Sequence, residues 1–573
     1  MIAAEYIAIE LQRRGVTHVF ELSGGMITFL IDALREKSTV QVVSMHHEQG
    51  AGFAAEGTAR FTGIPGVAMA TSGPGATNLL TAIGSCYFDS TPAVFITGQV
   101  NRAELKGSRA IRQLGFQETD IVSMAKPITK FAKLIERPEH LSQLLDDAFR
   151  VAMSGRPGPV LLDIPMDVQR SKYESVPIVA PGEIAPSLNT ELAPFWQRCQ
   201  AAIKRADRPL ILGGGGIRSA RAISEFRRFV RAVGIPVVNS LMAVDVLPSS
   251  DPLRVGLIGS YGNRWGNLAI SECDMLVVLG SRLDVRQTGS DTAEFKGTRS
   301  IFHVDCEPGE MNNRVTGCDT LISELAPFLD HAAEHSDLNS SSWNEWRTRL
   351  DMLRAEWPDT AESTGFDGIN PNKLMHQISR HAESAAAFVS DVGQHQQWAA
   401  QSLQLASNQR FMTSGGMGAM GFALPTAIGC ALAAGGQVVV IAGDGGFQLN
   451  IQELQTVIRL GLPLKIVVVN NGCHGMVRQF QEAYFKGRYH STLWGYSAPN
   501  FARIALAYGI QSASIETPDE VDAALQRCFS DPSTPYLLEV KVHTMANAYP
   551  KLAFGRPISQ MEPHSKSIEM EST

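Results

Sequence analysis

Short runs of apolar and β-branched residues recur along the chain and alternate with helix-length amphipathic segments. A strand buried on both faces of a sheet is a continuous apolar run, and strands that alternate with helices form parallel sheets. The pattern therefore predicts an α/β fold of doubly wound parallel sheets. The runs expected to be strands are His18–Phe20, Val40–Ser44, Val67–Thr71, Ala93–Thr97, Pro159–Asp163, Pro209–Leu212, Pro236–Asn239, Met275–Leu279, Ile301–Val304, Ala387–Ser390, Val438–Ala442, Lys465–Asn470 and Tyr536–Val540.

Two segments interrupt the alternation and predict domain boundaries: the proline-rich Tyr173–Pro194 and the polar, tryptophan-containing Leu338–Pro371. A length of 573 residues corresponds to three or four domains, and the interruptions favour three. The expected ranges are an N-terminal domain over 1–172, a central domain over 190–335, a C-terminal domain over 370–545 and a tail over 546–573. The polar end of the tail, Pro563–Thr573, is expected to fray.

Composition excludes several classes of protein. The net charge of -7 leaves no basic surplus for a nucleic-acid partner. The eight cysteines are scattered without a C-x-x-C pair, which argues against zinc ribbons and thioredoxin-type redox chemistry. The charge-free stretch Phe411–Gly443 is long enough to span a membrane, but Pro425 and several glycines interrupt it, so we expect a helix over Phe422–Ala434 and a strand over Gln437–Ala442 instead. The first residues predict an amphipathic helix, not a signal peptide, which favours a cytoplasmic protein.

The segment Val438–Asn471 carries the strongest chemical signal. A buried strand ends in Gly443-Asp444-Gly445-Gly446, an amphipathic helix follows, and a second buried strand ends in Asn470-Asn471. Open α/β sheets bind ligands at the carboxyl ends of their strands, where Asp444 and Asn471 are expected to converge. Carboxylate and amide oxygens suit Mg²⁺, and glycine backbone can approach a diphosphate. G-D-G alone is more often a plain turn, but the N-N after the next strand favours the metal site.

This spacing resembles the thiamine-diphosphate (ThDP) motif, and further stretches resemble one branch of that family, the acetolactate synthase large subunit. The stretches cover nearly the whole chain: HEQGAGFAAEGTAR (47–60), TSGPGATNLLTAIGSCYFDSTP (71–92), ITGQV (96–100), GPVLLDIPMDVQ (158–169), DVGQHQQWAAQ (391–401), GGMGAMGFALPTAIG (415–429) and GMVRQFQ (475–481). The resemblance implies three domains that serve the pyrimidine, an optional flavin and the diphosphate.

The resemblance also implies roles for single residues. Asp444, Asn471 and the backbone carbonyl of Cys473 would bind Mg²⁺. Glu48 would hydrogen-bond the aminopyrimidine ring and activate ThDP, although a lone acid after a strand is usually a helix-capping residue. Met476 would bend the cofactor, although a methionine in an apolar stretch is otherwise core filler. The remaining cofactor-binding residues would be Gly393, Gln394 and His395 with Gly443, Gly445 and Gly446 at the diphosphate, and Gly418 and Met420 at the pyrimidine.

The central domain carries a weaker signal for FAD. Leu210–Gly216 ends in four glycines but does not fit G-x-G-x-x-G cleanly. Gly280–Gly289 resembles the family's flavin stretch, and its Arg282 and Arg286 could pair with phosphates, with Gly213 and Gly214 near them. The alternative is that both arginines are ordinary surface residues. FAD would serve structure, because decarboxylation and ligation involve no net redox change.

Four departures from the family pattern lie near the expected substrate pocket. Phe480 stands where the family usually has Trp, Met166 replaces a Lys, and Met26 replaces an Ala. About six extra residues lie within Asn101–Gly115, a loop that contains Arg102, Lys106, Arg109 and Arg112. These departures are either neutral or adapted to a different acceptor, for which the cationic loop would suit a phosphate or carboxylate. Phe116 and Gln117 are expected to shape the acceptor side.

Together these observations predict a ThDP- and Mg²⁺-dependent 2-keto acid decarboxylase and carboligase of acetolactate synthase type. It would condense a two-carbon unit from pyruvate with a keto acid, as in branched-chain amino acid biosynthesis. The alternatives are an aldehyde or sugar acceptor, or a decarboxylase or lyase; Glu48, Asp444 and Asn471 argue against a homologue without turnover. In the family Glu48 and G-D-G come from different subunits, so a homodimer or homotetramer is expected, with a possible small regulatory subunit.

Overall fold

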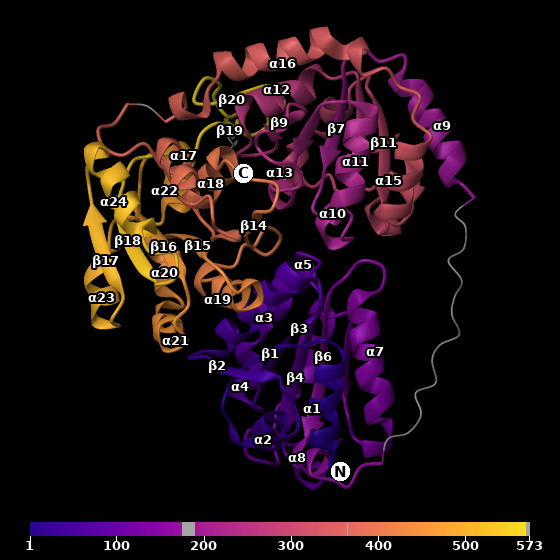
Figure 1. The fold of residues 1–573 in the computed structure, drawn as a ribbon, viewed down its shortest axis with the longest axis vertical. Coiled ribbons are helices and arrows are strands. Elements are labelled where there is room, and N and C mark those ends of the chain that lie inside the picture. Colours follow the sequence, from indigo (N-terminus) through magenta and orange to yellow (C-terminus); the bar gives the residue numbers. More distant parts are fainter. Residues whose placement is uncertain (175–189, 364, 569–573) are drawn as a thin grey trace.

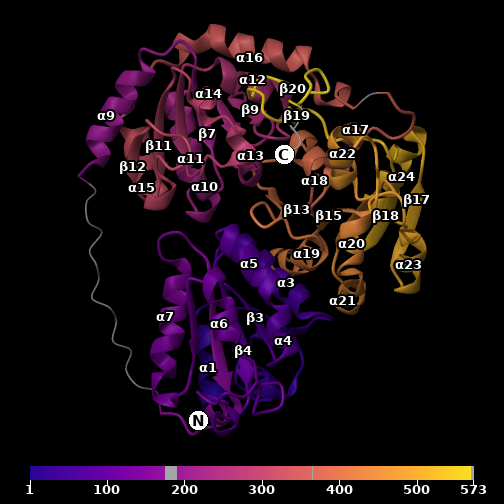
Figure 2. The same cartoon turned by 180° about the vertical axis from the view of Figure 1, so that it is seen from behind.

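The chain folds into three six-stranded parallel sheets covered by helices, as seen in a computed structural model that describes residues 1–174, 190–363 and 365–568. In Figures 1 and 2 the N-terminal sheet lies at one end of the molecule, and the central and C-terminal sheets lie side by side at the other. The expected α/β class of doubly wound parallel sheets is confirmed. The proline-rich boundary segment falls largely outside the described residues.

The first and third sheets share one strand order, and the middle sheet has another. The first sheet runs β2-β1-β3-β4-β6-β5, the third β14-β13-β15-β16-β18-β17, and the middle β12-β11-β10-β7-β8-β9. The chain order therefore reverses direction between β1 and β3, between β13 and β15, and between β7 and β10. Such reversals open the crevices in which α/β sheets bind ligands.

The strands are listed here by sheet. The first sheet contains β1 (His18–Leu22), β2 (Gln41–Ser44), β3 (Gly66–Ala70), β4 (Ala93–Gln99), β5 (Phe131–Leu134) and β6 (Pro159–Pro165). The middle sheet contains β7 (Pro209–Gly213), β8 (Val237–Asn239), β9 (Arg254–Leu257), β10 (Met275–Leu279), β11 (Ser300–Asp305) and β12 (Asp319–Ile322). The third sheet contains β13 (Ala387–Ser390), β14 (Arg410–Met412), β15 (Val438–Gly443), β16 (Leu464–Asn470), β17 (Gln511–Ile515) and β18 (Tyr536–Lys541).

The helices follow the same three-part division. With the first sheet are α1 (Ala3–Arg13), α2 (Thr28–Lys37), α3 (Glu48–Thr62), α4 (Pro74–Asn78), α5 (Leu80–Phe88), α6 (Ile121–Ala125), α7 (Leu141–Met153) and α8 (Met166–Gln169). With the middle sheet are α9 (Leu192–Ile203), α10 (Gly216–Ser219), α11 (Ile223–Val233), α12 (Arg264–Glu272), α13 (Val285–Thr288), α14 (Thr292–Lys296), α15 (Leu325–Glu334) and α16 (Asn344–Glu356). With the third are α17 (Pro371–His381), α18 (Gln394–Ser402), α19 (Ala423–Ala434), α20 (Asp444–Gln448), α21 (Leu454–Arg459), α22 (Gly475–Tyr484), α23 (Phe501–Ala507) and α24 (Val521–Phe529).

Alternating strand residues fill cores on the two faces of the first sheet. Val19, Val67 and Val94 belong to the core that includes residues of α1, α2 and α7. The neighbouring positions on the same strands face the core that holds α3, α5 and α19. Because both faces are buried, these strands are continuous apolar runs.

The helix pair α3 and α19 joins the first domain to the third. A Cβ added at Gly57 would lie 2.2 Å from the Thr426 carbonyl oxygen, and one at Gly429 would lie 1.9 Å from that of Ala54. Two glycines facing opposite backbones therefore let the helix axes come closer than side chains would allow. The rings of Phe53 and Phe422 pack edge to face across the same interface at 5.4 Å.

The structure corrects the expected elements at the sheet edges and in the third domain. The edge strands β5, β9, β12, β14 and β17 were not expected from the sequence. The single helix expected after G-D-G-G is instead α20, a 3-10 turn η9 (Ile451–Glu453) and α21. The break falls at Asn450, whose side chain donates to the Gly421 carbonyl at 2.7 Å and to Gln49 at 3.1 Å and so competes with helical bonding.

Two polar segments are more ordered than expected. The expected boundary 338–371 contains α16, whose Trp346 and Leu350 pack into the core of the central domain. The tail folds back as a hairpin of β19 (Lys551–Leu552) and β20 (Met561–Glu562), and Leu552, Ile558 and Met561 enter that same core. The expectation of fraying from Pro563 is wrong up to Ile568, whose N–H donates to Phe554 O at 2.9 Å; residues 569–573 lie outside the described chain.

The described helices include none that is long and apolar enough to cross a membrane. Phe411–Gly443 instead contributes β14, α19 and β15 to the third domain, as the interrupting Pro425 and glycines suggested. The eight cysteines are all free thiols.

Candidate active site

Asp444 and Asn471 stand at the carboxyl ends of the neighbouring strands β15 and β16, as the sequence predicts. One Asp444 carboxylate oxygen accepts from the Tyr496 hydroxyl at 2.9 Å. The Asn471 amide nitrogen donates to Gln394 Oε1 at 2.9 Å, and its oxygen accepts only a long bond from the Cys473 N–H at 3.3 Å. Burial raises the pKa of Asp444 to about 6. A bound cation would favour the ionised carboxylate and so lower this pKa.

The donor set at this edge fits a hard divalent cation. It offers a carboxylate oxygen from Asp444 and an amide oxygen from Asn471, and such oxygens suit Mg²⁺. Burial also raises the pKa of the Cys473 thiol to about 11, and sulfur is a soft ligand that Mg²⁺ does not favour. Any contribution of Cys473 would therefore come from its backbone carbonyl.

A buried carboxylate, Asp391 at the end of β13, binds the loop 415–421 and the start of α19 close to the G-D-G turn. It accepts from the N–H groups of Val392 (2.8 Å), Gly421 (3.0 Å) and Ala423 (2.9 Å). A Cβ at Gly446 would lie 2.5 Å from the same carboxylate. Burial raises the pKa of Asp391 to about 6, although these three bonds act in the opposite direction.

The predicted cofactor residues meet around this turn. Met420 Cε would be 3.5 Å from a Cβ placed on Gly445, and Gly418 on the same loop has a φ of 68°. Gly393 precedes α18, whose first residues are Gln394 and His395. The His395 ring accepts from the Gly443 N–H at 3.2 Å, and burial lowers its pKa to about 3, so it is a neutral acceptor. Met476 lies half-buried at the start of α22.

Glu48 begins α3 and is buried, with its carboxylate accepting from the Asn78 side chain at 2.9 Å. His47, not Glu48, caps the helix by accepting from the Gln49 N–H. The start of α3 contacts the third domain at Glu453, which accepts from the His46 N–H at 2.9 Å. Within the described chain Glu48 makes no hydrogen bond to Asp444 or Asn471.

Phe116 and Gln117 lie on an exposed but well-organised loop. Phe116 is 80% exposed, and Gln117 has a φ of 64°, a left-handed conformation that is uncommon outside glycine. Glu118 holds the loop together by accepting from the N–H groups of Lys106 (2.6 Å) and Leu114 (2.7 Å). Non-glycine residues in such conformations are concentrated at functional sites.

The cations of this loop are only partly available to a ligand. Arg102 pairs with Asp167 at 2.7 Å, so a positive charge stands beside Asp167 although position 166 is Met. Arg109 donates to backbone carbonyls of its own loop. Lys106 and Arg112 make no ion pair with any residue that the structure describes.

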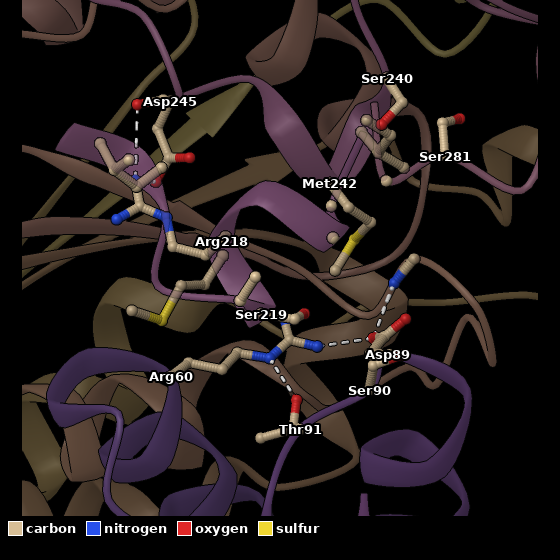
Figure 3. A pocket seen from close by; sticks show the side chains of 18 of the residues that line it. Arg60, Asp89, Ser90, Thr91, Arg218, Ser219, Ser240, Met242, Asp245 and Ser281 are labelled. Atoms are coloured by element: carbon tan, nitrogen blue, oxygen red, sulfur yellow. Dashed lines mark hydrogen bonds and ion pairs between the residues drawn. The ribbon is translucent and has the colours of Figure 1, made fainter. Parts of the chain in front are cut away.

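A cavity of about 700 Å³ lies where the three domains meet, over the crevice between β7 and β10 (Figure 3). Figure 3 shows Arg60 of the first domain between Thr91 and Asp89, which it contacts at 3.1 and 2.7 Å. Asp89 in turn accepts from the Gly415 N–H at 3.1 Å, so the cavity wall is continuous with the loop 415–421. Arg218 pairs with Asp245 at 2.7 Å on the central-domain side.

The predicted flavin residues are divided at this cavity. Arg282 and Arg286 line it, together with Gly215 and Gly216. Gly213 and Gly214 are not lining residues: Gly213 ends β7, and a Cβ at Gly214 would lie 2.1 Å from the Gly280 carbonyl oxygen. The arginine side chains and the closely packed glycine backbone fit an elongated ligand that carries phosphates.

Several residues of the site were missed in the sequence. Asp391 follows an expected strand, just as Asp444 does, and the same argument could have found it. Tyr496 carries no local signal, because it reaches the site from a segment that the topology alone brings there. Gln479, which accepts from Gln394 at 3.0 Å, lies in the same stretch as Met476, but its spacing does not indicate this bond. No pattern in the sequence indicates that Asn78 is the hydrogen-bond partner of Glu48.

Comparison with known proteins gives consistent matches along the chain. Residues 1–124, 196–331 and 391–540 match the N-terminal TPP binding domain, the central domain and the C-terminal TPP binding domain of thiamine pyrophosphate enzymes. The acetolactate synthase isozyme 2 large subunit of Escherichia coli is 37% identical, over 98% of this chain and 99% of that protein. Acetolactate synthase 2, chloroplastic, of Nicotiana tabacum is 36% identical (95% and 82%), and the large subunit of Porphyra purpurea is 34% identical (96% and 93%).

Proposed function

Since the chain belongs to the thiamine pyrophosphate enzymes of the acetolactate synthase large-subunit type, we propose that it joins a two-carbon unit from pyruvate to a 2-keto acid with the help of Mg²⁺. The observation that carries the proposal is the convergence of Asp444 and Asn471 at adjacent strand ends, with Gln394 bonded to one of them. When bound, thiamine diphosphate supplies the electron sink that stabilises the carbanion left when the donor loses CO₂.

The residues of this chain would divide the work as follows. Asp444, Asn471 and the Cys473 carbonyl would hold Mg²⁺. Gly393, Gln394 and His395, at the N-terminus of α18, would approach the diphosphate together with the G-D-G-G turn.

The loop 415–421, with Gly418 and Met420, would hold the pyrimidine ring, and Met476 would support its bend. Glu48 would exchange a proton with the pyrimidine, and Phe116 and Gln117 would border the acceptor. The N-terminal domain (1–172) would serve the pyrimidine, the central domain (190–335) the flavin, and the C-terminal domain (370–545) the diphosphate and Mg²⁺. The tail (546–573) follows these three domains.

Assembly is part of the proposal. Glu48 makes no hydrogen bond to Asp444 or Asn471 within the described chain, which supports a site completed by a second copy in a homodimer or homotetramer. Several of the relatives, among them two isozymes of Escherichia coli, are named large subunits, which supports a small regulatory subunit as a further partner. FAD would occupy the cavity between the three domains, where Arg282, Arg286 and Gly216 would meet its phosphates.

The deciding experiment is mass spectrometry of the products formed from pyruvate, ThDP and Mg²⁺. Acetolactate together with CO₂ is the expected result, and omission of Mg²⁺ after chelation should stop both. Acetaldehyde as the sole product would replace the carboligase with a decarboxylase. No pyruvate consumption by a protein that binds ThDP would overturn the proposal.

A different acceptor is the second candidate, favoured by the loop around Glu118. Lys106 and Arg112 of this loop have no ion-pair partner among the described residues and could attract an anionic acceptor. Phe480 is 44% exposed, which would allow an acceptor bulkier than a keto acid, such as a carbohydrate. Adding sugar and aldehyde acceptors to the same assay separates the candidates. A new ligation product that suppresses acetolactate would favour the second.

A further inference from the structure

Gln479 connects the metal side of the site to the backbone near the C-terminus. It lies on α22 and is only 3% exposed. Gln394 Nε2 donates to Gln479 Oε1 at 3.0 Å, and Asn471 Nδ2 donates to Gln394 Oε1 at 2.9 Å. Gln479 also accepts from the Ala548 N–H at 3.0 Å and donates to the Ala548 carbonyl at 3.1 Å. Three side-chain amides therefore form one chain that ends on a backbone peptide.

The hydrogen bonds between the three side-chain amides all run in one direction, which the Ala548 backbone imposes. An amide side chain has a donor end and an acceptor end, which differ little in shape but not in chemistry. Because Ala548 offers one N–H and one carbonyl, only one orientation of Gln479 satisfies both. The oxygen of Gln479 then requires the nitrogen of Gln394, whose oxygen in turn requires the nitrogen of Asn471. The Asn471 oxygen, which accepts the 3.3 Å bond from the Cys473 N–H, thereby keeps its remaining lone pair for a cation. A reversed amide would present an NH₂ group, which cannot bind one.

The surrounding packing keeps the three amides in register. A Cβ at Gly475 would lie 2.0 Å from Gln394 Oε1 and 2.6 Å from Asn471 Nδ2, so only glycine leaves room for their bond. The buried Arg478 donates to the Asn547 side chain and to the Ala546 carbonyl. These contacts fix the segment 546–548 against α22, so the peptide on which the amide chain ends is itself held.

We propose that Gln479 is a positioning residue that sets the orientation of the Asn471 amide for Mg²⁺. The inference rests on the proposed function, because it takes Asn471 as a metal ligand. It goes beyond that function by assigning to α22 and the segment 546–548 the control of metal affinity. Outer hydrogen-bond partners of metal ligands typically contribute about 10–100-fold to metal affinity.

The test is a Mg²⁺ titration of the full-length protein at saturating ThDP, followed by intrinsic tryptophan fluorescence and by calorimetry. Gln479→Met has nearly the same volume but no amide, and it should weaken the apparent Mg²⁺ affinity by about tenfold. At saturating Mg²⁺ the amount of ThDP bound per chain should return to the wild-type value. This combination separates a misoriented ligand from general damage to the domain.

Gln481→Met is the matched control, because Gln481 lies on the same helix and bonds to the His490 carbonyl and Thr492 instead. It should leave the Mg²⁺ affinity unchanged. If Gln479→Met does not fold, Gln479→Asn serves instead, since its amide is one methylene too short to reach Gln394. A folded Gln479 variant with wild-type Mg²⁺ affinity would overturn the inference alone. A wild-type protein whose ThDP binding ignores Mg²⁺ would overturn the proposed metal site as well.

Discussion

The first and third sheets have the same strand order but present different chemistry at their strand ends. In the third sheet the strands beside the reversal of direction end in Asp391 and Asp444, with Asn471 on the next strand. In the first sheet the corresponding strands β1 and β3 are followed by Ser23-Gly24 and Thr71-Ser72, which carry no charge. The shared topology supplies a crevice in both sheets, and the strand-end residues decide which ligand can bind there.

The middle sheet extends this comparison with a different strand order and with arginines, two of them paired with Asp245 and Asp284, near its reversal. Its reversal lies between β7 and β10, where the cavity lining includes Arg218, Arg282 and Arg286. A carboxylate and amide edge is suited to a cation, whereas an arginine-lined edge is suited to phosphates. The three sheets thus differ in the chemistry they could offer a ligand, and substitutions at or near their strand ends test these differences.

The largest effect is expected at the edge of the third sheet where Asp444 and Asn471 lie, the proposed Mg²⁺ site. Asp444→Ala removes the carboxylate from the donor set and should weaken Mg²⁺-dependent ThDP binding by more than about a hundredfold, beyond the loss of an outer partner. Calorimetry with ThDP and Mg²⁺ measures it. Thr71→Ala, at the matching strand end of the first sheet, should leave Mg²⁺ affinity unchanged. Saturable Mg²⁺-dependent binding by the Asp444 variant would refute the assignment.

The next effect concerns Glu48, the carboxylate that follows the edge strand β2 of the first sheet. Glu48→Gln keeps the size and the contact with Asn78 but removes the ionisable group. CO₂ release from pyruvate should fall by several hundredfold, since general acid–base groups supply about 10²–10⁴. ThDP and Mg²⁺ binding should persist, which separates a chemical role from a binding role. Turnover equal to wild type would eliminate Glu48 as the acid.

A smaller effect is expected at the middle sheet. The purified protein should carry flavin, visible in its absorption spectrum. A Cβ at Gly216 would lie 2.8 Å from Gly280 Cα, so Gly216→Ala forces backbone to move and should reduce the flavin content by more than half. Gly309→Ala, where the nearest atom is 3.8 Å away, is the control in the same domain. A colourless wild-type protein would remove FAD from the proposal.

The smallest effect is expected at a buried acid inside the first sheet. Asp163 on β6 accepts from Thr97 at 2.7 Å and Gln99 at 2.9 Å, and burial raises its pKa to about 7. Its carboxyl binds a proton more tightly in the folded than in the unfolded chain. This contribution to stability is therefore complete below the ordinary pKa of 3.8 and is lost as the pH rises through about 7.

Thermal unfolding at pH 5.5 and pH 8 tests this prediction. The midpoint of the wild-type protein should fall towards the higher pH, and Asp163→Asn should reduce that fall by about 2–4 °C, the shift that 1 kcal/mol causes in a domain of this size. Thr97→Val removes a hydrogen bond to the ionised carboxylate and should steepen the pH dependence. Equal midpoint shifts in all three proteins would show that Asp163 does not titrate in this range.

The strands predicted from the sequence and those that were missed differ in position within the sheets. Interior strands such as β4, β10 and β16 are buried on both faces, so their apolar runs are visible in the sequence. Of the six edge strands, only β2 was expected. An edge strand such as β17, with the sequence QSASI, is partly exposed, and its pairing comes from the neighbouring strand, not from its own residues.

The same division applies to the site. Asp444, Asn471 and the glycines around them lie in one βαβ unit, so their spacing along the chain is enough to predict that they meet. Tyr496 and Ala548 reach that site across longer stretches of chain, and no spacing signals it. Gln479 is close to Asn471 along the chain, but its bonds to Gln394 and Ala548 depend on the tertiary structure. The sequence by itself determined the class of fold and the residues at the strand ends, because local pattern controls both, and its resemblance to a known family implied the cofactor. The tertiary structure alone decided how the Asn471 amide is oriented, which arginines remain available and where the tail packs, because hydrogen bonds and burial between distant segments exist only after the domains have closed around one another.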